Sequence, residues 1–230
     1  MEELIFIGFP ESGLRFLSGL KKNNNKAWFD KRKEIYEQDV LQPLKALVWE
    51  IGLKLSRDVA PNLVFEPKVN RTIFRIYRDT RFSNDKSPYK TNVAAFLWEG
   101  NRGRNSSPGF YVHIEDDAVY VGAGIYLFDA QGLELFRKAV LDRRMGGKLD
   151  KILADRKLKP FLPVMGEQLK RVPSGYPADH PRADFLRYKG LYLGTSRDPG
   201  TVHTRRFLNS TVNTMRKLGD LHGWLREVLG

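Results

Sequence analysis

From residue 63 to residue 128, apolar and polar side chains alternate with a period of two, and no other feature constrains the fold of this chain as strongly. Such a period is typical of strands whose side chains point alternately to the two faces of a sheet. Turn-forming residues interrupt it at residues 83–88, at residues 100–108 and at Asp116-Asp117. The pattern predicts strands at residues 72–78, 92–98, 110–115 and 118–127. Because their connections are too short for helical crossovers, we expect a largely antiparallel sheet.

The segments on either side of the predicted sheet have the period of helices. Asn24 or Asn25 is suited to cap an N-terminal helix, and Pro43 should kink or divide the helix that contains it. Helical patterns return at residues 130–141, 148–156 and 205–229.

Residues 160–181 are rich in proline but also in apolar side chains, which a solvated linker would lack, so we expect an ordered loop there. The sequence therefore predicts an α+β fold in a single domain over residues 1–230. In it, a largely antiparallel sheet at about residues 63–128 is packed by helices from residues 11–57 and by the helices and proline-rich loop of residues 129–230.

Composition and charge exclude several kinds of site. The 230 residues include no cysteine, which excludes disulfides, thiolate nucleophiles and thiolate metal ligands. Met1-Glu2-Glu3 is acidic where a secretory signal would be basic, and the apolar run at residues 4–9 is too short for a signal core or a membrane span. We therefore expect a cytoplasmic protein with no membrane partner. A net charge of +12 predicts attraction to anions, among them nucleic acid and phosphorylated small molecules.

The hairpin around Asp116-Asp117 determines which side chains share a face. A two-residue turn at this position pairs Ile114 with Val119 and Tyr111 with Gly122. One face is then apolar and suited to the core, with Phe110, Val112, Ile114, Val119, Val121 and Ala123. The other face is aromatic and polar, with Tyr111, His113, Tyr120, Gly122, Gly124 and Tyr126. Because glycine weakens a strand, Gly122 and Gly124 indicate that another group approaches the backbone closely.

The strand expected at residues 72–78 brings further side chains toward that polar face. Its alternation directs Phe74 and Ile76 to the core and Asp79 to the opposite side. If the two polar faces form one surface, we expect a pocket above Gly122 and Gly124 that is lined by Arg75, Tyr77, Tyr111, His113 and Tyr126. The alternative is an ordinary solvent-exposed sheet surface, on which tyrosine is common.

Residues 71–91 carry six basic side chains and only two acidic ones, interleaved with aromatic residues. Guanidinium groups bind carboxylate or phosphate through paired hydrogen bonds, so this segment predicts an anion site. The expected ligand-binding residues are Arg75, Tyr77, Arg78, Arg81, Lys86, Tyr89 and Lys90, with Tyr111 and Tyr126 from the sheet. Asp79 and His113 are the candidates for moving a proton. A second basic segment, residues 137–171, lacks interleaved aromatic residues and is typical of a solvated helix face.

Short motifs extend over nearly the whole chain, at residues 16–17, 23–24, 28–29, 75–79, 81–83, 85–86, 88–91, 122–126, 169–173, 175–176 and 179–181. Taken together they resemble a known family of bacterial and fungal proteins, the one catalogued as domain of unknown function 2461. The resemblance implies one fold unit over the chain. It implies no activity, substrate or catalytic residue.

Other chemical patterns in the sequence are weak. Ser83 and Lys86 match S-x-x-K but lack the partner motifs of serine enzymes with that spacing. The four histidines have no metal-ligand spacing, and Gly122-Ala123-Gly124 lies inside a strand rather than at a strand-to-helix turn. We therefore predict neither a metal nor a cofactor.

Three functions are compatible with these residues. The first is the binding of a phosphorylated or carboxylated small molecule in an Arg-rich pocket on the sheet, with or without catalysis. The second is a nucleic-acid-binding accessory protein, in which Tyr77, Phe82 or Tyr89 stacks on bases. The third is a structural interaction protein whose charged residues form surface ion pairs. Arginines pointing into an enclosed pocket favour the first, whereas an open basic stripe that joins the two basic segments favours the second. The oligomeric state does not follow from the sequence.

Overall fold

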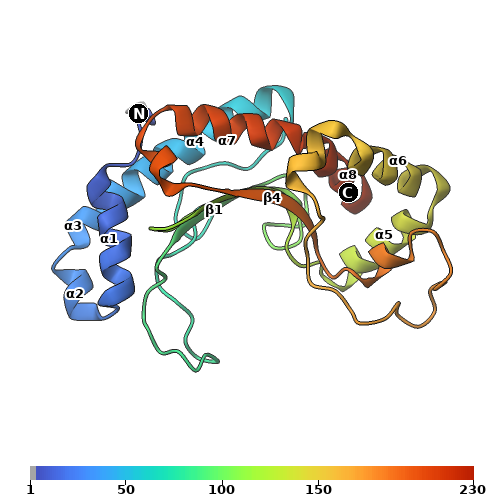
Figure 1. The fold of residues 1–230 in the computed structure, drawn as a ribbon, viewed down its shortest axis with the longest axis horizontal. Helices are drawn as coiled ribbons and strands as arrows, with labels where there is room; N and C mark the ends of the chain where they lie inside the picture. The colour runs from blue at the N-terminus through green and yellow to red at the C-terminus, as the bar shows by residue number, and fades with distance from the viewer. Residues whose placement is uncertain (1–3) are drawn as a thin grey trace.

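The computed structural model describes residues 4–230, so the acidic start Met1-Glu2-Glu3 lies outside the described residues. Helices precede and follow the sheet along the chain (Figure 1). The N-terminal helices are α1 (Glu11–Lys22), α2 (Lys26–Asp30), α3 (Lys33–Ile35), the π-helical η1 (Tyr36–Leu41) and α4 (Gln42–Asp58). The strands are β1 (Val93–Trp98), β2 (Gly109–Ile114), β3 (Val119–Ile125) and β4 (Leu191–Arg197). The other helices are α5 (Ala130–Leu141), α6 (Arg143–Ala154), α7 (Arg206–Lys217), α8 (Gly219–Leu229) and three 3₁₀ segments, η2 (Arg156–Phe161), η3 (Ala183–Arg187) and η4 (Pro199–His203).

Local signals in the sequence explain the N-terminal helices. Asn25 caps α2, because its side chain accepts a hydrogen bond from the Trp28 amide at 3.0 Å. A change of helix geometry occurs at Pro43, where we expected a kink or a division: the π-helical η1 runs directly into α4 one residue before the proline, which cannot donate the backbone hydrogen bond of a regular helix. The helix then ends at Asp58, shortly before Pro61.

The sheet is antiparallel throughout, with its strands in the order β1-β2-β3-β4, and this confirms the α+β class. The register predicted for the hairpin is also confirmed, from the pair Ile114 and Val119 to the pair Gly109 and Gly124. The side chains of its apolar face are at most 2% exposed and belong to a core that extends from Phe6 to Leu229.

Two predictions for the strands were wrong. Residues 72–78 do not form a regular strand but run beside β1 through isolated bridges, Ile73 to Ala95 and Tyr77 to Tyr89. These bridges are four residues apart on one side and six on the other, so two extra residues interrupt the ladder and end the alternation. Phe74, whose amide donates to the Ala94 carbonyl at 3.0 Å, is half-buried on the side away from the core, whereas Ile76 lies in the core. Strand β4 was not predicted, because it follows the proline-rich stretch instead of continuing the hairpin series.

Helices cover one face of the sheet and leave the other open. Figure 1 shows α4 and α7 along one side, while α1 to α3 lie beyond one end of the sheet and α5 beyond the other. The sheet thus forms an arch, and the loop that precedes β1 projects on its inner side.

The proline-rich stretch is an ordered loop that pairs with other segments, as predicted. Met165 exchanges two backbone hydrogen bonds with Tyr192 of β4, at 2.9 and 3.1 Å. The Lys189 amide donates to the Glu167 carbonyl at 2.8 Å, and the Leu169 amide donates to the Arg187 carbonyl at 2.8 Å. The loop therefore continues the sheet beyond β4 and closes one side of the open face.

Candidate functional site

The floor of the open face is made of glycines and one flat tyrosine ring. Gly122 pairs with Gly194 across β3 and β4, and the Tyr120 ring lies over both. A Cβ atom added at Gly122 would lie 3.0 Å from the Tyr120 hydroxyl oxygen, and one added at Gly194 would overlap that oxygen. At Gly124, which has a φ of 139°, the group that comes close is the β4 backbone at Leu191. The close approach inferred from the glycines is thus made by groups of the protein itself.

Two cavities lie over this floor and share a wall. The larger, of about 870 Å³, extends over β3 and β4 and is mostly apolar, with Phe96, Tyr120, Tyr192 and Met165 among its lining residues. The smaller, of about 630 Å³, extends over β1 and β2 and is lined by Arg78, Asp79, Lys90, Asn92, Ala94 and His113. Phe74, Tyr111 and Tyr126 line both. The two cavities therefore adjoin, and we call them together the sheet groove.

Two cations lie against the Phe74 ring at the wall of this groove, and a third, Arg75, is close enough for its charge to act on one of them. The guanidinium carbon of Arg104 lies 3.8 Å from the ring centroid, and the Lys90 ammonium nitrogen lies 5.4 Å from it. Burial lowers the pKa of Lys90, and the nearby charges of Arg75 and Arg104 lower it further. Burial also lowers the pKa of Arg104. We call Arg75, Lys90 and Arg104 the cation cluster.

No carboxylate of residues 4–230 forms an ion pair with the cation cluster. The ion pairs of the surrounding segment involve other cations: Arg71 with Glu66, Arg78 with Asp85, and Arg81 with Asp79. Cations that are drawn together and partly buried without an anion repel one another, which disfavours their charged forms. The cluster is therefore an arrangement that a bound anion would stabilise.

The remaining predicted cations are bound to other groups of the loop. Arg81 donates to Asp79 from Nε at 3.0 Å and from Nη2 at 2.7 Å, and these bonds, with one from the Arg81 amide, hold the pKa of Asp79 at about 2. Asp79 thus stays ionised near neutral pH, which makes it a poor general acid. The Lys86 ammonium donates to the Thr80 carbonyl at 3.0 Å, away from the sheet groove.

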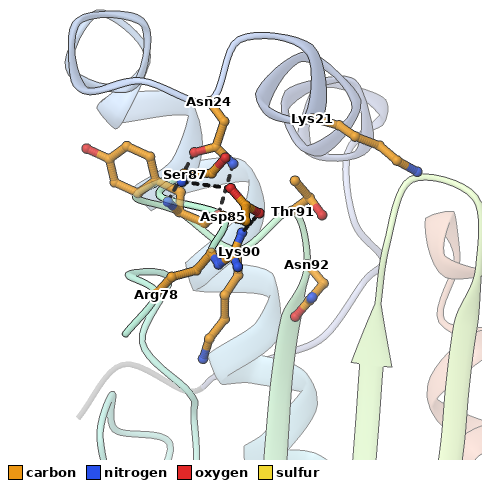
Figure 2. A pocket seen from close by; sticks show the side chains of 9 residues that line it. Lys21, Asn24, Arg78, Asp85, Ser87, Lys90, Thr91 and Asn92 are labelled. Atoms are coloured by element: carbon orange, nitrogen blue, oxygen red, sulfur yellow. Dashed lines mark hydrogen bonds and ion pairs between the residues drawn. The ribbon is translucent and has the colours of Figure 1, made fainter. Parts of the chain in front are cut away.

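A third, smaller cavity of about 300 Å³ lies between this loop and the turn that joins α1 to α2 (Figure 2). Here the Asn24 side chain accepts from the Tyr89 amide at 3.0 Å and donates to the Tyr89 carbonyl at 2.9 Å. The Asp85 carboxylate lies between Arg78 and the Ser87 amide, whereas Lys90 extends away from it. These contacts fix the loop on which Lys90 is carried.

The two predicted tyrosines of the loop have structural contacts. Tyr89 is buried and its ring stacks on Phe29 at 4.2 Å. Tyr77 is half-exposed and packs on the rings of Tyr89 and Phe29. Neither tyrosine lines the sheet groove. Tyr89 lines only the third cavity, the one of about 300 Å³.

A chain of hydrogen bonds runs along β2 at the wall shared by the two cavities. The Tyr111 hydroxyl lies 3.0 Å from His113 Nδ1, and His113 Nε2 lies 2.5 Å from the Glu115 carboxylate. Since a carboxylate only accepts, Nε2 carries the proton, and in the neutral imidazole Nδ1 accepts from Tyr111. Burial, with the charge of Glu115 and the proximity of Tyr126, raises the pKa of Tyr111 to about 12. The groove thus contains a histidine that is oriented to accept a proton.

An acidic group lies at the far end of the same hairpin. Oxygen atoms of Glu115, Asp116 and Asp117 lie within 4.8 Å of one another, a spacing that a cation could use. The Lys21 ammonium already contacts Asp116 at 3.3 Å and Asp117 at 3.0 Å, and its positive charge opposes a metal ion there.

Sequence reasoning missed several residues of the groove. Arg104 lies in the turn-rich segment 100–108, where nothing in its neighbours distinguishes it from a loop cation. Tyr192 and Gly194 belong to the unpredicted β4. The strand β4 alternates only in its first half, where Leu191 and Leu193 share one face and Tyr192 and Gly194 the other, and this short pattern was the available signal.

Comparison with known proteins confirms the resemblance seen in the motifs. Residues 12–224 match the model of a family described as "Conserved hypothetical protein (DUF2461)". No curated protein matches the chain. In the part of the chain that the structure describes, no helix has both the length and the apolar character that crossing a bilayer requires.

Proposed function

The chain belongs to the DUF2461 family, and we propose that it binds a phosphorylated or carboxylated small molecule in the sheet groove. The observation that carries this proposal is the cation cluster of Arg75, Lys90 and Arg104, with which no carboxylate of residues 4–230 forms an ion pair. Placing like charges together has a free-energy cost that folding alone does not explain. A bound anion would offset it.

The ligand-binding cations differ in part from those expected from the sequence. Lys90 and Arg104 line the groove, and Arg75 lies close enough to influence the pKa of Lys90. Arg78 also lines it but is paired with Asp85, so it contributes charge without a free hydrogen-bonding fork. The exposed pair of Arg81 and Asp79 lies at the rim and is not part of the proposed site.

The same groove offers proton transfer next to the bound anion. Tyr111 lines both cavities, and His113 accepts from it while Glu115 orients the imidazole. A ligand group that gives a proton to Tyr111 would pass the charge on to His113, where Glu115 stabilises the imidazolium. An enzyme that uses this relay is the catalytic form of the proposal. The cysteine-free composition fits the reducing cytoplasm as its compartment.

One observation supports a second candidate, nucleic-acid binding. At the tip of the basic loop Phe82 is 95% exposed, and the Arg81 guanidinium lies 5.7 Å from its ring centroid. An exposed aromatic ring beside a cation is suited to stack on a base. The second basic segment adds little to such a surface, because Arg144 and Lys148 are paired with Glu227, and Lys157 is paired with Asp220.

A titration by calorimetry separates these functions. Inorganic phosphate should bind the wild-type protein, and both Lys90→Met and Arg104→Gln should weaken that binding by about tenfold, the effect of losing one charged hydrogen bond. Arg81→Gln should leave phosphate binding unchanged. Single-stranded oligonucleotides, tested over a series of salt concentrations, should bind only if the second candidate is right, and Arg81→Gln should then weaken them. If phosphate binding is undetectable, or is the same in all variants, the first proposal is wrong.

A further inference from the structure

The larger cavity of the sheet groove contains two polar groups that the protein leaves without partners. Ser107 is 1% exposed, and its hydroxyl finds no hydrogen-bond partner within residues 4–230. The Tyr120 hydroxyl oxygen is also buried and has no partner among the same residues. Both side chains line the larger cavity. Leaving a buried hydroxyl unpaired costs about 1–3 kcal/mol. Neither oxygen has exposed surface, so a ligand in the cavity supplies the missing partners only when each hydroxyl turns toward it.

The remaining wall of this cavity suits a flat ring. Tyr126 is 81% exposed, although it lies against Tyr192 with ring centroids 6.0 Å apart. The floor is the flat Tyr120 ring over glycines, and a side chain at Gly122 or Gly194 would push this ring out of its place. Aromatic rings are attracted to such surfaces by stacking and by burial of apolar area.

The aromatic cavity and the cation cluster are joined by a series of ring contacts. Arg104 packs on Phe74, whose ring centroid lies 6.2 Å from that of Tyr111, and Tyr111 in turn lies 6.1 Å from Tyr120. Arg104 itself lines the larger cavity. One molecule of moderate size can therefore contact the cations with one end and the tyrosines with the other.

We infer that the ligand joins an anionic group to an aromatic ring that carries hydrogen-bonding atoms, as a nucleoside monophosphate does. This inference rests on the proposed function, since the anionic group is the one bound by the cation cluster. The ring lies over Tyr120 and beside Tyr126, and its polar atoms bind the Ser107 and Tyr120 hydroxyls.

Three probes test the inference by calorimetry on the full chain: inorganic phosphate, ribose phosphate and AMP. AMP should bind about tenfold more tightly than ribose phosphate, which lies within the effect of stacking one base on an aromatic side chain. Tyr126→Ala should remove most of this advantage while leaving the affinity for ribose phosphate unchanged. Because Tyr126 is largely exposed, this variant should fold normally, and its circular dichroism spectrum and melting temperature provide the check.

Two further variants test the hydrogen bonds. Tyr120→Phe and Ser107→Ala should each lower the affinity for AMP by about fivefold, without any effect on inorganic phosphate, because each removes one hydroxyl and nothing else. Lys90→Met should weaken all three probes.

The outcomes separate the inference from the function on which it rests. Equal affinities for AMP and ribose phosphate would overturn the inference about the ring and leave the anion site intact. If the double variant Lys90→Met/Arg104→Gln binds AMP as tightly as the wild type, one ligand does not contact both the aromatic cavity and the cation cluster. Failure of every probe, phosphate included, would overturn the proposed function itself. If oligonucleotides bind far more tightly than AMP, and their affinity depends steeply on salt concentration, the ligand is nucleic acid and the inference of a small molecule is wrong.

Discussion

The Arg104 guanidinium lies 3.8 Å from the centroid of the Phe74 ring, and the Lys90 ammonium approaches the same ring to 5.4 Å. One aromatic ring thus holds two cations from different segments of the chain, in a groove where no carboxylate of residues 4–230 pairs with them. The attraction of cations to the ring offsets part of their mutual repulsion. The arrangement resembles that of a site prepared for an anion.

Removing one of these cations should therefore not destabilise the free protein. Lys90→Met keeps the length of the side chain and relieves repulsion with Arg75 and Arg104, so the free energy of unfolding should stay the same or rise slightly. Urea denaturation with and without phosphate measures both effects, since phosphate should raise the stability of the wild type and not that of the variant. The matched control is Lys86→Met, on the same loop, which should preserve stabilisation by phosphate. A large loss of stability in Lys90→Met would mean that the lysine is a structural residue.

The affinity for anions should decrease with rising pH, and this decrease should begin at a lower pH than it would if Lys90 had the usual pKa of a lysine. Burial and the charges of Arg75 and Arg104 lower the pKa of Lys90 from its usual 10.5, so the free protein loses this proton below that pH. In the free protein this titration relieves repulsion, and stability should increase as the pH rises through the lowered pKa. Binding of an anion favours the protonated form, so affinity should decrease over the same interval. Sulfate is a suitable probe, because its charge is constant over this pH interval. In Lys90→Met, the affinity for sulfate should depend less on pH than in the wild type.

The covered side of the sheet should control stability in acid. Glu99 is buried, where desolvation alone would raise its pKa, but hydrogen bonds from His222 and the Asn62 amide and the charge of Arg226 lower that pKa from 4.5 to about 2. A carboxyl group with a lowered pKa stabilises the folded state above pH 4.5 and loses that contribution as the pH falls toward 2. The loss should be about 3 kcal/mol.

Thermal unfolding across this pH range measures the loss. Glu99→Gln should be less stable at neutral pH and should show a flatter dependence of the melting temperature on pH between about 5 and about 2. Glu134→Gln, which removes an exposed carboxylate on α5, should leave the slope as it is. Equal slopes in wild type and Glu99→Gln would contradict the assignment.

Asn24 should determine how firmly the basic loop is held. Its side chain makes two hydrogen bonds to the Tyr89 backbone, so Asn24→Ala leaves a buried amide and carbonyl without partners and should cost about 1–3 kcal/mol. Hydrogen exchange at the Tyr89 amide should become faster in this variant. Asn23→Ala, one residue away, removes only a bond to the Gly19 carbonyl and should leave exchange at Tyr89 unchanged.

The sequence predicted the local part of this structure and missed the parts that depend on distant segments. The hairpin register followed from alternation and a two-residue turn, both of which act over a few residues. The cap at Asn25 and the division before α4 followed from local backbone chemistry in the same way. In contrast, two extra residues between Tyr89 and Ala95 interrupt the pairing, so that Phe74 and Ile76 lie on opposite sides although they are two residues apart. Alternation alone cannot show such an interruption.

The candidate site shows the same limit. The basic loop and the aromatic face were both recognisable, and the structure brings Arg75, Arg78, Lys90, Tyr111, His113 and Tyr126 to one region. Which cations are free depends on pairing: Arg78 with Asp85 and Arg81 with Asp79 are contacts within the loop, whereas Arg104 reaches Phe74 from a different turn. Charge counts along the chain do not reveal such pairing.

Irregular segments lie along both outer strands of the sheet. Beside β1, the Phe74 amide donates to the Ala94 carbonyl at 3.0 Å and the Phe96 amide donates to the Thr72 carbonyl at 2.8 Å. Beside β4, Met165 occupies both backbone groups of Tyr192. At these positions a foreign strand would find no vacant donors or acceptors, which protects the molecule from edge-to-edge aggregation. A protein that approaches the sheet at these positions must therefore contact side chains rather than add a strand of its own.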